Sequence, residues 1–322
     1  MKTHTSSLLV PFVCLAGSTL AVGQSDFPVK PITLVIAAGP GGSSDKFSRV
    51  MALHMEKQLG QPVVLEYKPG GGNNIGIEHV VRSKPDGYTL LMAGNPLAVN
   101  PSLYKKLTYK LDDLAPISMV SVSPYLLVLS SSTPVKTLPE LVAYAKQNPA
   151  KLSYGSPGIG SGAHMGGALL NMRADIKITH IPYKNSSQVL TDIMGNNLQM
   201  TFTSLVVGTQ LVEAGRIRAL AVTSSSRSTS LPNIPTVAEQ GYPGYELTGW
   251  YGVMAPRATP PDVIAKLNEA IVSTLKDPEV VKALNVDGIE LVPGTPQDFA
   301  KFLQRTAAEA AIVVKATGAT AE

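Results

Sequence analysis

A buried strand, a glycine-rich turn and the start of a helix follow one another in ITLVIAAGPGGSSD, residues 32–45. A second turn of the same kind, GSPGIGSGAH at residues 155–164, again stands between a short strand and a helical pattern. A glycine turn that opens a helix leaves backbone N–H groups unpaired at the positive end of the helix dipole, where an anion can bind. Two such turns, far apart in the chain, indicate two lobes that hold one small anion between them.

Neither turn matches a nucleotide-binding motif. Ser44 stands where a dinucleotide fingerprint requires glycine, and no Gly-Lys-Ser or Gly-Lys-Thr follows either turn. Most glycine turns between a strand and a helix only connect them. The presence of two such turns in one chain is what favours a ligand site. We therefore expect an anion other than a nucleotide.

The composition indicates a folded α/β protein. A chain of 322 residues can form two domains of ordinary size. Charged residues make up 16% and hydrophobic residues 44% of the chain, which excludes an intrinsically disordered protein. The net charge of +4 is spread along the sequence without a basic run containing aromatic residues, so no nucleic-acid partner is expected.

The first 23 residues are typical of a cleaved secretory signal peptide. Lys2 gives a positive start, Leu8–Leu15 form a short apolar core, and cleavage is expected after Ala21 or Gly23. The apolar core is too short to span a bilayer. Cys14 is in a poor context for lipid attachment, and no other cysteine occurs in the chain, so the mature protein has no thiol chemistry. These features predict a periplasmic protein.

Strand and helix patterns alternate along the chain, which predicts parallel sheets with helices on both faces. Strand patterns at residues 114–121 and 125–130 lead toward a second lobe, and the strand at 248–255, which contains Trp250, returns to the first. The chain is therefore expected to cross between the lobes near residues 122–126 and 246–250. This division predicts a discontinuous first lobe at residues 24–124 and 248–322, and a second lobe at 125–247.

Polar residues at the ends of strands extend the candidate site, because ligands of open α/β sheets bind at the carboxyl ends of strands. Asn95 follows the third strand, although it could equally form a turn, and Thr203 and Ser204 end a strand of the second lobe. With the two turns, these give the candidate ligand-binding residues Ala38, Gly39, Pro40, Gly41, Gly42, Ser43, Asp45, Asn95, Gly160, Ser161, Gly162, His164, Thr203 and Ser204.

Catalysis, a metal ion and a cofactor are not expected. No two histidines of the mature chain have a metal-binding spacing. Ser161 and His164 could form an exported hydrolase, but no Gly-x-Ser-x-Gly elbow surrounds Ser161 and no partner carboxylate is evident. Backbone hydrogen bonding or ligand contact explains His164 better, and helix capping explains Asp45 better than a role as general base.

Several sequence segments occur in order from about residue 27 to the C-terminus: KPI (30–32) with PGGSSD (40–45), GQPVVLE (60–66) with KPGGG (68–72), PDGYTL (85–90), HIPYK (180–184), and ALAVT (219–223) with SR (226–227) and LPNIPTVAE (231–239). Each segment is a modest signal, but together they are specific. They resemble the Bug family, the extracytoplasmic solute-binding proteins of tripartite tricarboxylate transporters.

The resemblance implies a two-lobed, type II-like Venus-flytrap fold, in which each lobe has a mixed, mostly parallel sheet flanked by helices. It also implies a monomer that grips a carboxylate with backbone groups of both turns, partly through ordered water, and delivers it to membrane permease subunits. An exported hydrolase using Ser161 and His164, and a ligand-sensing partner of a membrane sensor kinase, are the alternatives.

Three departures from the family pattern prevent the transfer of any member's substrate. Ala37-Ala38 replaces the usual Pro-Phe before the first turn, and Lys184-Asn185-Ser186 replaces the usual Lys-Gly-Ser. A tryptophan common in the last helix is replaced near Ala310-Ala311. The first two departures are expected near the cleft, and the loss of an aromatic ring could enlarge or reshape the pocket.

Overall fold

The computed structural model describes residue 1 and residues 26–149, 151–284 and 289–321. The expected cleavage sites and nearly all of the expected signal peptide lie outside these residues. None of the helices formed by the described residues combines the length and the hydrophobicity needed to cross a bilayer.

The sheet of the first lobe combines three parallel strands with three antiparallel strands among the described residues. β1 lies between β2 and β3 with parallel ladders, and β3 pairs antiparallel with β9. β9 and β10 then flank β4, both antiparallel to it. β1 is apolar and almost entirely buried, as expected for a strand covered by helices on both faces. The strands are β1 (Ile32–Ile36), β2 (Val63–Tyr67), β3 (Thr89–Gly94), β4 (Leu114–Ser130), β9 (Thr248–Pro256) and β10 (Glu290–Leu291).

The sheet of the second lobe is built on the other half of β4. β7 and β8 pair antiparallel with β4, and β5 lies parallel to both β7 and β6. These strands are β5 (Ser153–Ser156), β6 (Thr179–Pro182), β7 (Met200–Ser204) and β8 (Ile217–Val222). The mixed, mostly parallel α/β architecture expected from the sequence is therefore confirmed.

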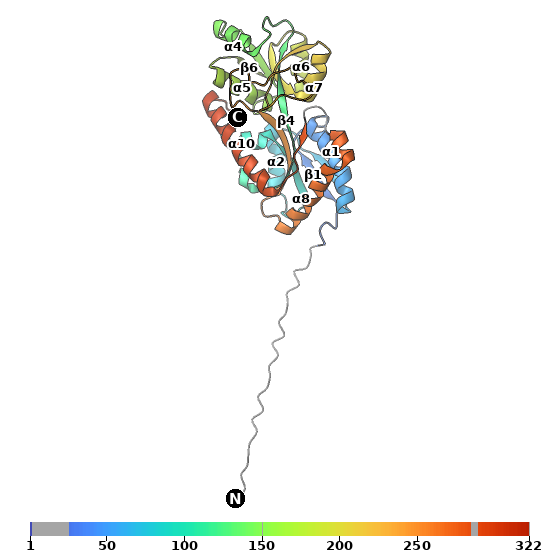
Figure 1. Cartoon of the computed structure of the whole chain (residues 1–322). Coiled ribbons are helices and arrows are strands. Elements are labelled where there is room, and N and C mark those ends of the chain that lie inside the picture. The colour runs from blue at the N-terminus through green and yellow to red at the C-terminus, as the bar shows by residue number, and fades with distance from the viewer. Residues whose placement is uncertain (2–25, 150, 285–288, 322) are drawn as a thin grey trace.

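One strand, β4, belongs to both sheets. It pairs with β9 as far as Pro124 and with β7 from Tyr125 onward. Figure 1 shows it running from the lower lobe into the upper one. The sequence suggested two strands separated near residues 122–124, and that separation is wrong. Pro124 has no N–H to donate, but it lies opposite Thr248, where β9 begins, so the strand continues through it.

Helices cover both faces of each sheet, and the described residues form four apolar clusters beneath them. In the first lobe, α1, α8 and α9 cover one face, while α2, α3 and the start of α10 cover the other. In the second lobe, α4 and α5 cover one face and α6 and α7 the other. The helices are α1 (Ser43–Leu59), α2 (Asn74–Val81), α3 (Asn95–Leu103), α4 (Leu138–Gln147), α5 (Gly162–Ala174), α6 (Ser186–Met194), α7 (Leu205–Glu213), α8 (Pro261–Lys276), α9 (Pro278–Leu284) and α10 (Pro296–Thr317), with short 3-10 turns η1 (Gly71–Asn73) and η2 (Leu111–Asp113).

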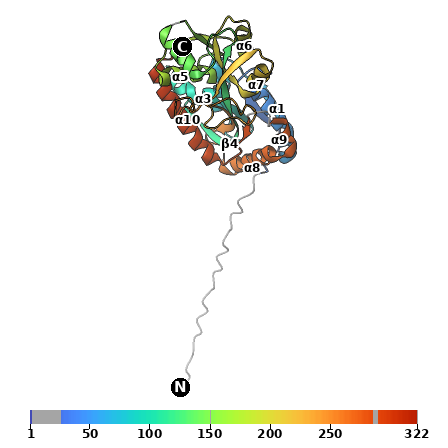
Figure 2. The same ribbon diagram turned by 45° about the horizontal axis from the view of Figure 1, so that its top comes forward.

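The helices α3 and α10 connect the two lobes by packing. Val99 and Leu103 of α3, with Ala310 and Val314 of α10, are buried in the same cluster as the core of the second lobe. Figures 1 and 2 both place α10 along the side of the molecule where α5 lies, and the two helices are in contact. Ala310 lies near the position where the family commonly has a tryptophan, and it is buried between the lobes.

Thr223, directly after β8, joins the two segments that pass between the lobes. The Tyr125 N–H donates to its hydroxyl oxygen at 2.7 Å, and that hydroxyl donates to the Leu247 carbonyl at 2.6 Å. The Thr223 backbone N–H donates to the Tyr125 carbonyl, and the Leu247 N–H donates to the Thr223 carbonyl, both at 2.9 Å. Buried Thr223 thus holds Tyr125 of β4 beside Leu247, which directly precedes β9.

We predict that Thr223→Val lowers the free energy of unfolding by about 1–3 kcal/mol, because it keeps the shape of the side chain but leaves the Tyr125 amide and the Leu247 carbonyl without a partner. Urea denaturation measures the change. Thr191→Val is the matched control, since in the described structure the exposed Thr191 hydroxyl bonds only to the Ser187 carbonyl within α6, and its effect should stay within about 0.5 kcal/mol. Equal effects of both variants would contradict the role assigned to Thr223.

Candidate ligand-binding site

The first glycine turn presents the N-terminus of α1 on the surface. Gly42 is the N-cap, and because glycine has no side chain, it does not cap the first backbone N–H groups of the helix. Gly41 has a φ of +87°, which favours glycine, and a Cβ added at Gly39, Gly41 or Gly42 would meet no atom within 4 Å. Together with Ala38, Pro40 and Ser43, these residues therefore form an open rim around the end of the helix.

Asp45 uses its carboxylate to hold the first turn together. It accepts the Gly41 N–H at 2.8 Å, the Arg49 Nε–H at 2.7 Å and the Tyr67 hydroxyl at 2.5 Å. These bonds, the one from Tyr67 first, hold the pKa of Asp45 below its usual range. Asp45 has the capping role suggested by its position, and its bond to Gly41 means that the Gly41 amide is not an open donor for a ligand.

The second glycine turn is capped by its own serine. Ser161 is the N-cap of α5; its hydroxyl accepts the His164 N–H at 3.3 Å and donates to the Gly158 carbonyl at 2.6 Å. Gly160 has a φ of +82°, and a Cβ there would lie 3.0 Å from Leu103 of α3. Gly162 is the first helical residue. The second turn is therefore packed against the first lobe, unlike the exposed first turn.

Buried His164 and half-buried His180 form a pair behind the second turn. The Gly160 N–H donates to Nδ1 of His164 at 3.2 Å, and Nε2 of His180 lies 2.7 Å from the Ser156 hydroxyl. The two imidazole rings are 4.4 Å apart. Burial lowers the pKa of each histidine to about 4, and for His180 the nearby His164 adds to the effect. Both rings are therefore neutral at pH 7, and His164 acts as a hydrogen-bond acceptor that shapes the turn.

Two tyrosines on the crossing strands face the two helix N-termini. Tyr125 of β4 lies against α5, since a Cβ on Gly162 would be 1.9 Å from its hydroxyl oxygen. Tyr251 of β9 packs against Phe47 of α1, with 5.4 Å between the ring centroids. Burial raises the pKa of Tyr251, and the Ser43 hydroxyl and the Ser44 amide at the start of α1 partly offset that rise. Burial also raises the pKa of Tyr125, and Tyr251 adds to the effect. The sequence analysis did not identify either tyrosine.

The remaining candidates have varied positions. Asn95 begins α3, and both ends of its side-chain amide are bonded to β9: Nδ2 donates to the Thr248 carbonyl at 3.3 Å, and Oδ1 accepts the Trp250 N–H at 3.1 Å. Thr203 is buried, with its methyl group near Gly208 of α7. Ser204 lies opposite Tyr125 in the ladder of β4 and β7. Asn95 thus has a structural role at the crossing, and Ser204 is a strand-end residue beside Tyr125.

Local contacts explain two departures from the family sequence pattern, at Asn185 and at Ala37. Asn185 is the N-cap of α6, and its Oδ1 accepts the Gln188 N–H at 3.0 Å, a bond that glycine could not make. Ala37 lies beside Gly76 of α2, where an added Cβ would come within 2.6 Å of the Ala37 methyl group. Ala37 therefore allows α2 to approach the end of β1 closely.

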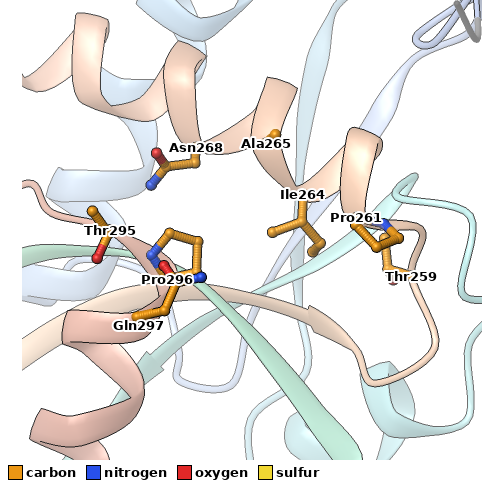
Figure 3. Close-up of a pocket in the computed structure, with 8 residues that line it drawn as sticks. All are labelled: Thr259, Pro261, Ile264, Ala265, Asn268, Thr295, Pro296 and Gln297. Carbon is orange, nitrogen blue, oxygen red and sulfur yellow. The ribbon is translucent and has the colours of Figure 1, made fainter.

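Two further features lie outside the glycine turns. A pocket of about 470 Å³ lies between α8 and the start of α10 (Figure 3) and is lined by uncharged residues: Thr259, Pro261, Ile264, Ala265, Asn268, Thr295, Pro296 and Gln297. His54, Asp277 and Glu279 bring potential metal ligands within 4.8 Å of one another. Asp277 accepts the Glu279 N–H at 2.8 Å, so the start of α9 explains its position without a metal ion.

The histidine pair predicts a loss of stability in acid. Unfolded imidazoles have a pKa near 6.5, whereas the folded ones bind protons only near pH 4, so the unfolded chain binds more protons as the pH falls between these values. The free energy of unfolding should fall there by at most roughly 1.4 kcal/mol per pH unit for each histidine. In urea unfolding from pH 7 to pH 4.5, His180→Gln should reduce the slope, and a slope identical to that of the wild type would contradict the pairing.

Known proteins were compared with this chain. A sequence model of the family described as "Tripartite tricarboxylate transporter family receptor" matches residues 47–319. The protein BugT of Bordetella pertussis is 36% identical over 320 residues, which are 98% of each chain. The solved structure of the periplasmic binding protein BugD is 31% identical, with a TM-score of 0.81 over 92% of this chain and 100% of BugD. Rpa4515 of R. palustris, solved with adipate, is 32% identical, with a TM-score of 0.83 over 91% of this chain and 99% of its own. This chain therefore belongs to the tripartite tricarboxylate transporter receptor family and has the fold of its periplasmic solute-binding proteins.

Proposed function

We propose that this protein is a periplasmic receptor that captures a small organic carboxylate between its lobes and delivers it to the membrane permease of a tripartite transporter. One observation carries the proposal: the N-termini of α1 and α5, one from each lobe, each lie beside a tyrosine of the crossing strands, Tyr251 and Tyr125 respectively. Two positive helix ends beside the crossing favour an anion. The adipate in the related Rpa4515 supports a carboxylate as that anion.

The division of the chain gives this function a mechanism. The first lobe comprises residues 24–124 and 248–322 and the second lobe residues 125–247, so the crossings lie in β4 and at the start of β9. Closure occurs as a hinge motion about these crossings and about the contact of α10 with α5, and a ligand that touches both lobes stabilises the closed form. The receptor acts as a monomer and presents the bound solute to the permease.

The geometry disfavours the hydrolase alternative. The Ser161 hydroxyl donates to a backbone carbonyl, and Nδ1 of His164 accepts a backbone N–H, so the two side chains do not form a nucleophile–base pair. We therefore propose that the ligand is released unchanged. A role as the ligand-sensing partner of a sensor kinase would use the same site, and the identity of the membrane partner separates it from transport.

A thermal-shift screen of mono-, di- and tricarboxylates, including aromatic acids, tests the proposal. Adipate or a related acid should raise the melting temperature, because a ligand that binds only the folded state stabilises it. The matching amide, adipamide for adipate, should give little or no shift, since it lacks the negative charge that the helix ends favour. Mass spectrometry should recover the acid unchanged.

Two results would contradict the proposal. Equal shifts with the acid and its amide would show that charge is not recognised. Formation of a product from an ester substrate, abolished by Ser161→Ala, would instead establish the hydrolase.

A further inference from the structure

The backbone donors at the two helix N-termini are only partly open to a ligand. The Gly41 amide is bonded to Asp45, and the His164 amide is bonded to the Ser161 hydroxyl. The Gly160 amide is bonded to His164. A carboxylate between the helices therefore needs donors other than these three amides.

The phenolic O–H of Tyr251 can be polarised by the positive N-terminus of α1. Its ring packs against Phe47 of α1, with 5.4 Å between the ring centroids, and lies 3.4 Å from a Cβ placed on Gly94, the N-cap of α3. Burial raises the pKa of Tyr251, and the Ser43 hydroxyl and the Ser44 amide at the start of α1 partly offset that rise. The phenol keeps its proton and can donate it to an acceptor. An O–H polarised by a helix N-terminus is a stronger donor than an isolated one.

Tyr125 has the corresponding place at α5. Glycines on two different elements make room for it: a Cβ would be 1.9 Å from its hydroxyl oxygen at Gly162 and 3.0 Å at Gly249. In the described part of the chain, this hydroxyl has no hydrogen-bond partner, although its backbone is fixed by Thr223. A phenol held in a glycine-lined space, beside a helix N-terminus and without a partner, is arranged to donate to a ligand.

We propose that the hydroxyls of Tyr125 and Tyr251 donate the hydrogen bonds that hold the ligand's carboxylate, so that the anion is recognised through two phenols on the crossing strands. This inference rests on the proposed function. The two donors come from β4 and β9, where the chain passes between the lobes, so the ligand would contact the crossing itself as well as the glycine turns. A bound carboxylate would then stabilise the position of both crossing strands.

The chemistry of the phenols suits this role. Burial raises the pKa of both tyrosines, so they keep their protons and remain donors throughout the physiological pH range. Neutral donors beside helix N-termini can stabilise a carboxylate without a lysine or arginine. The neighbouring histidines are also neutral, and the carboxylate of Asp45 is satisfied by its own three donors.

Tyrosine-to-phenylalanine variants test the inference because they keep the ring and its packing and remove only the hydroxyl. Adipate is the first probe, replaced in every sample by another acid if that acid gives the larger thermal shift. In titration calorimetry, Tyr125→Phe and Tyr251→Phe should each raise the Kd about tenfold or more, the loss expected for one hydrogen bond to a charged group. Tyr144→Phe, on α4 of the second lobe, is the matched control and should keep the wild-type Kd.

The melting temperature of each ligand-free variant shows whether it is folded as the wild type is. Folded Tyr125→Phe and Tyr251→Phe proteins that bind with the wild-type Kd would overturn this inference and leave the proposed function intact. If the wild-type protein binds no carboxylate of the panel, the proposed function itself fails. If a variant is less stable, NMR of wild-type protein produced with ¹³Cζ-labelled tyrosine replaces the variant. The Tyr125 and Tyr251 resonances should shift when the acid binds. Unchanged resonances would contradict direct contact.

Discussion

The antiparallel pairing of β4 with β9 is the constraint on which the rest of the structure depends. These strands place Tyr125 and Tyr251 where the lobes meet, and the same pairing positions Trp250 and Thr248, to which Asn95 is bonded. Because β3 pairs with β9 beside this point, α1 and α3 begin at a fixed distance from the crossing. On the other side, β7 pairs with β4 from Tyr125 onward, which sets the position of the second lobe's strands. The ladder thus provides one common frame for groups from both lobes.

Among the groups described above, the candidate site favours an anion without a positively charged side chain other than Arg49, which is paired with Asp45. Two helix N-termini supply partial positive charge, and the polar side chains around them are neutral: two tyrosines, two histidines and Ser43. The charged residue at the first turn, Asp45, is neutralised locally by Arg49 and by the bonds from Gly41 and Tyr67. Such a site binds a carboxylate through oriented dipoles, which require little reorganisation when the ligand enters. Neutral His164 is part of this arrangement, since a protonated imidazole could not accept the Gly160 N–H.

The sequence predicted those features that depend on local chemistry. The glycine turns, the capping role of Asp45, the start of α5 near Ser161 and the buried β1 strand follow from residue type and spacing over a few positions, and the structure has them. The family resemblance supplied the overall fold. Contacts between distant segments could not be predicted in this way. Asn95 is bonded to β9, and His180 lies against His164. Tyr125 and Tyr251 lie against the starts of α5 and α1. Each of these contacts joins different elements of the fold. The positions of the tyrosines at the expected crossings were the one available signal, because residues at a crossing between lobes are close to whatever the lobes enclose.

A crystal structure of the protein with adipate, or with the acid that gives the largest thermal shift, tests the central claim most directly. The carboxylate should lie between the N-termini of α1 and α5, within hydrogen-bond distance of the Tyr125 and Tyr251 hydroxyls and without a lysine or arginine as its partner. A carboxylate paired with a basic side chain, or bound in the pocket between α8 and α10, would contradict recognition by neutral donors at the crossing of the two lobes.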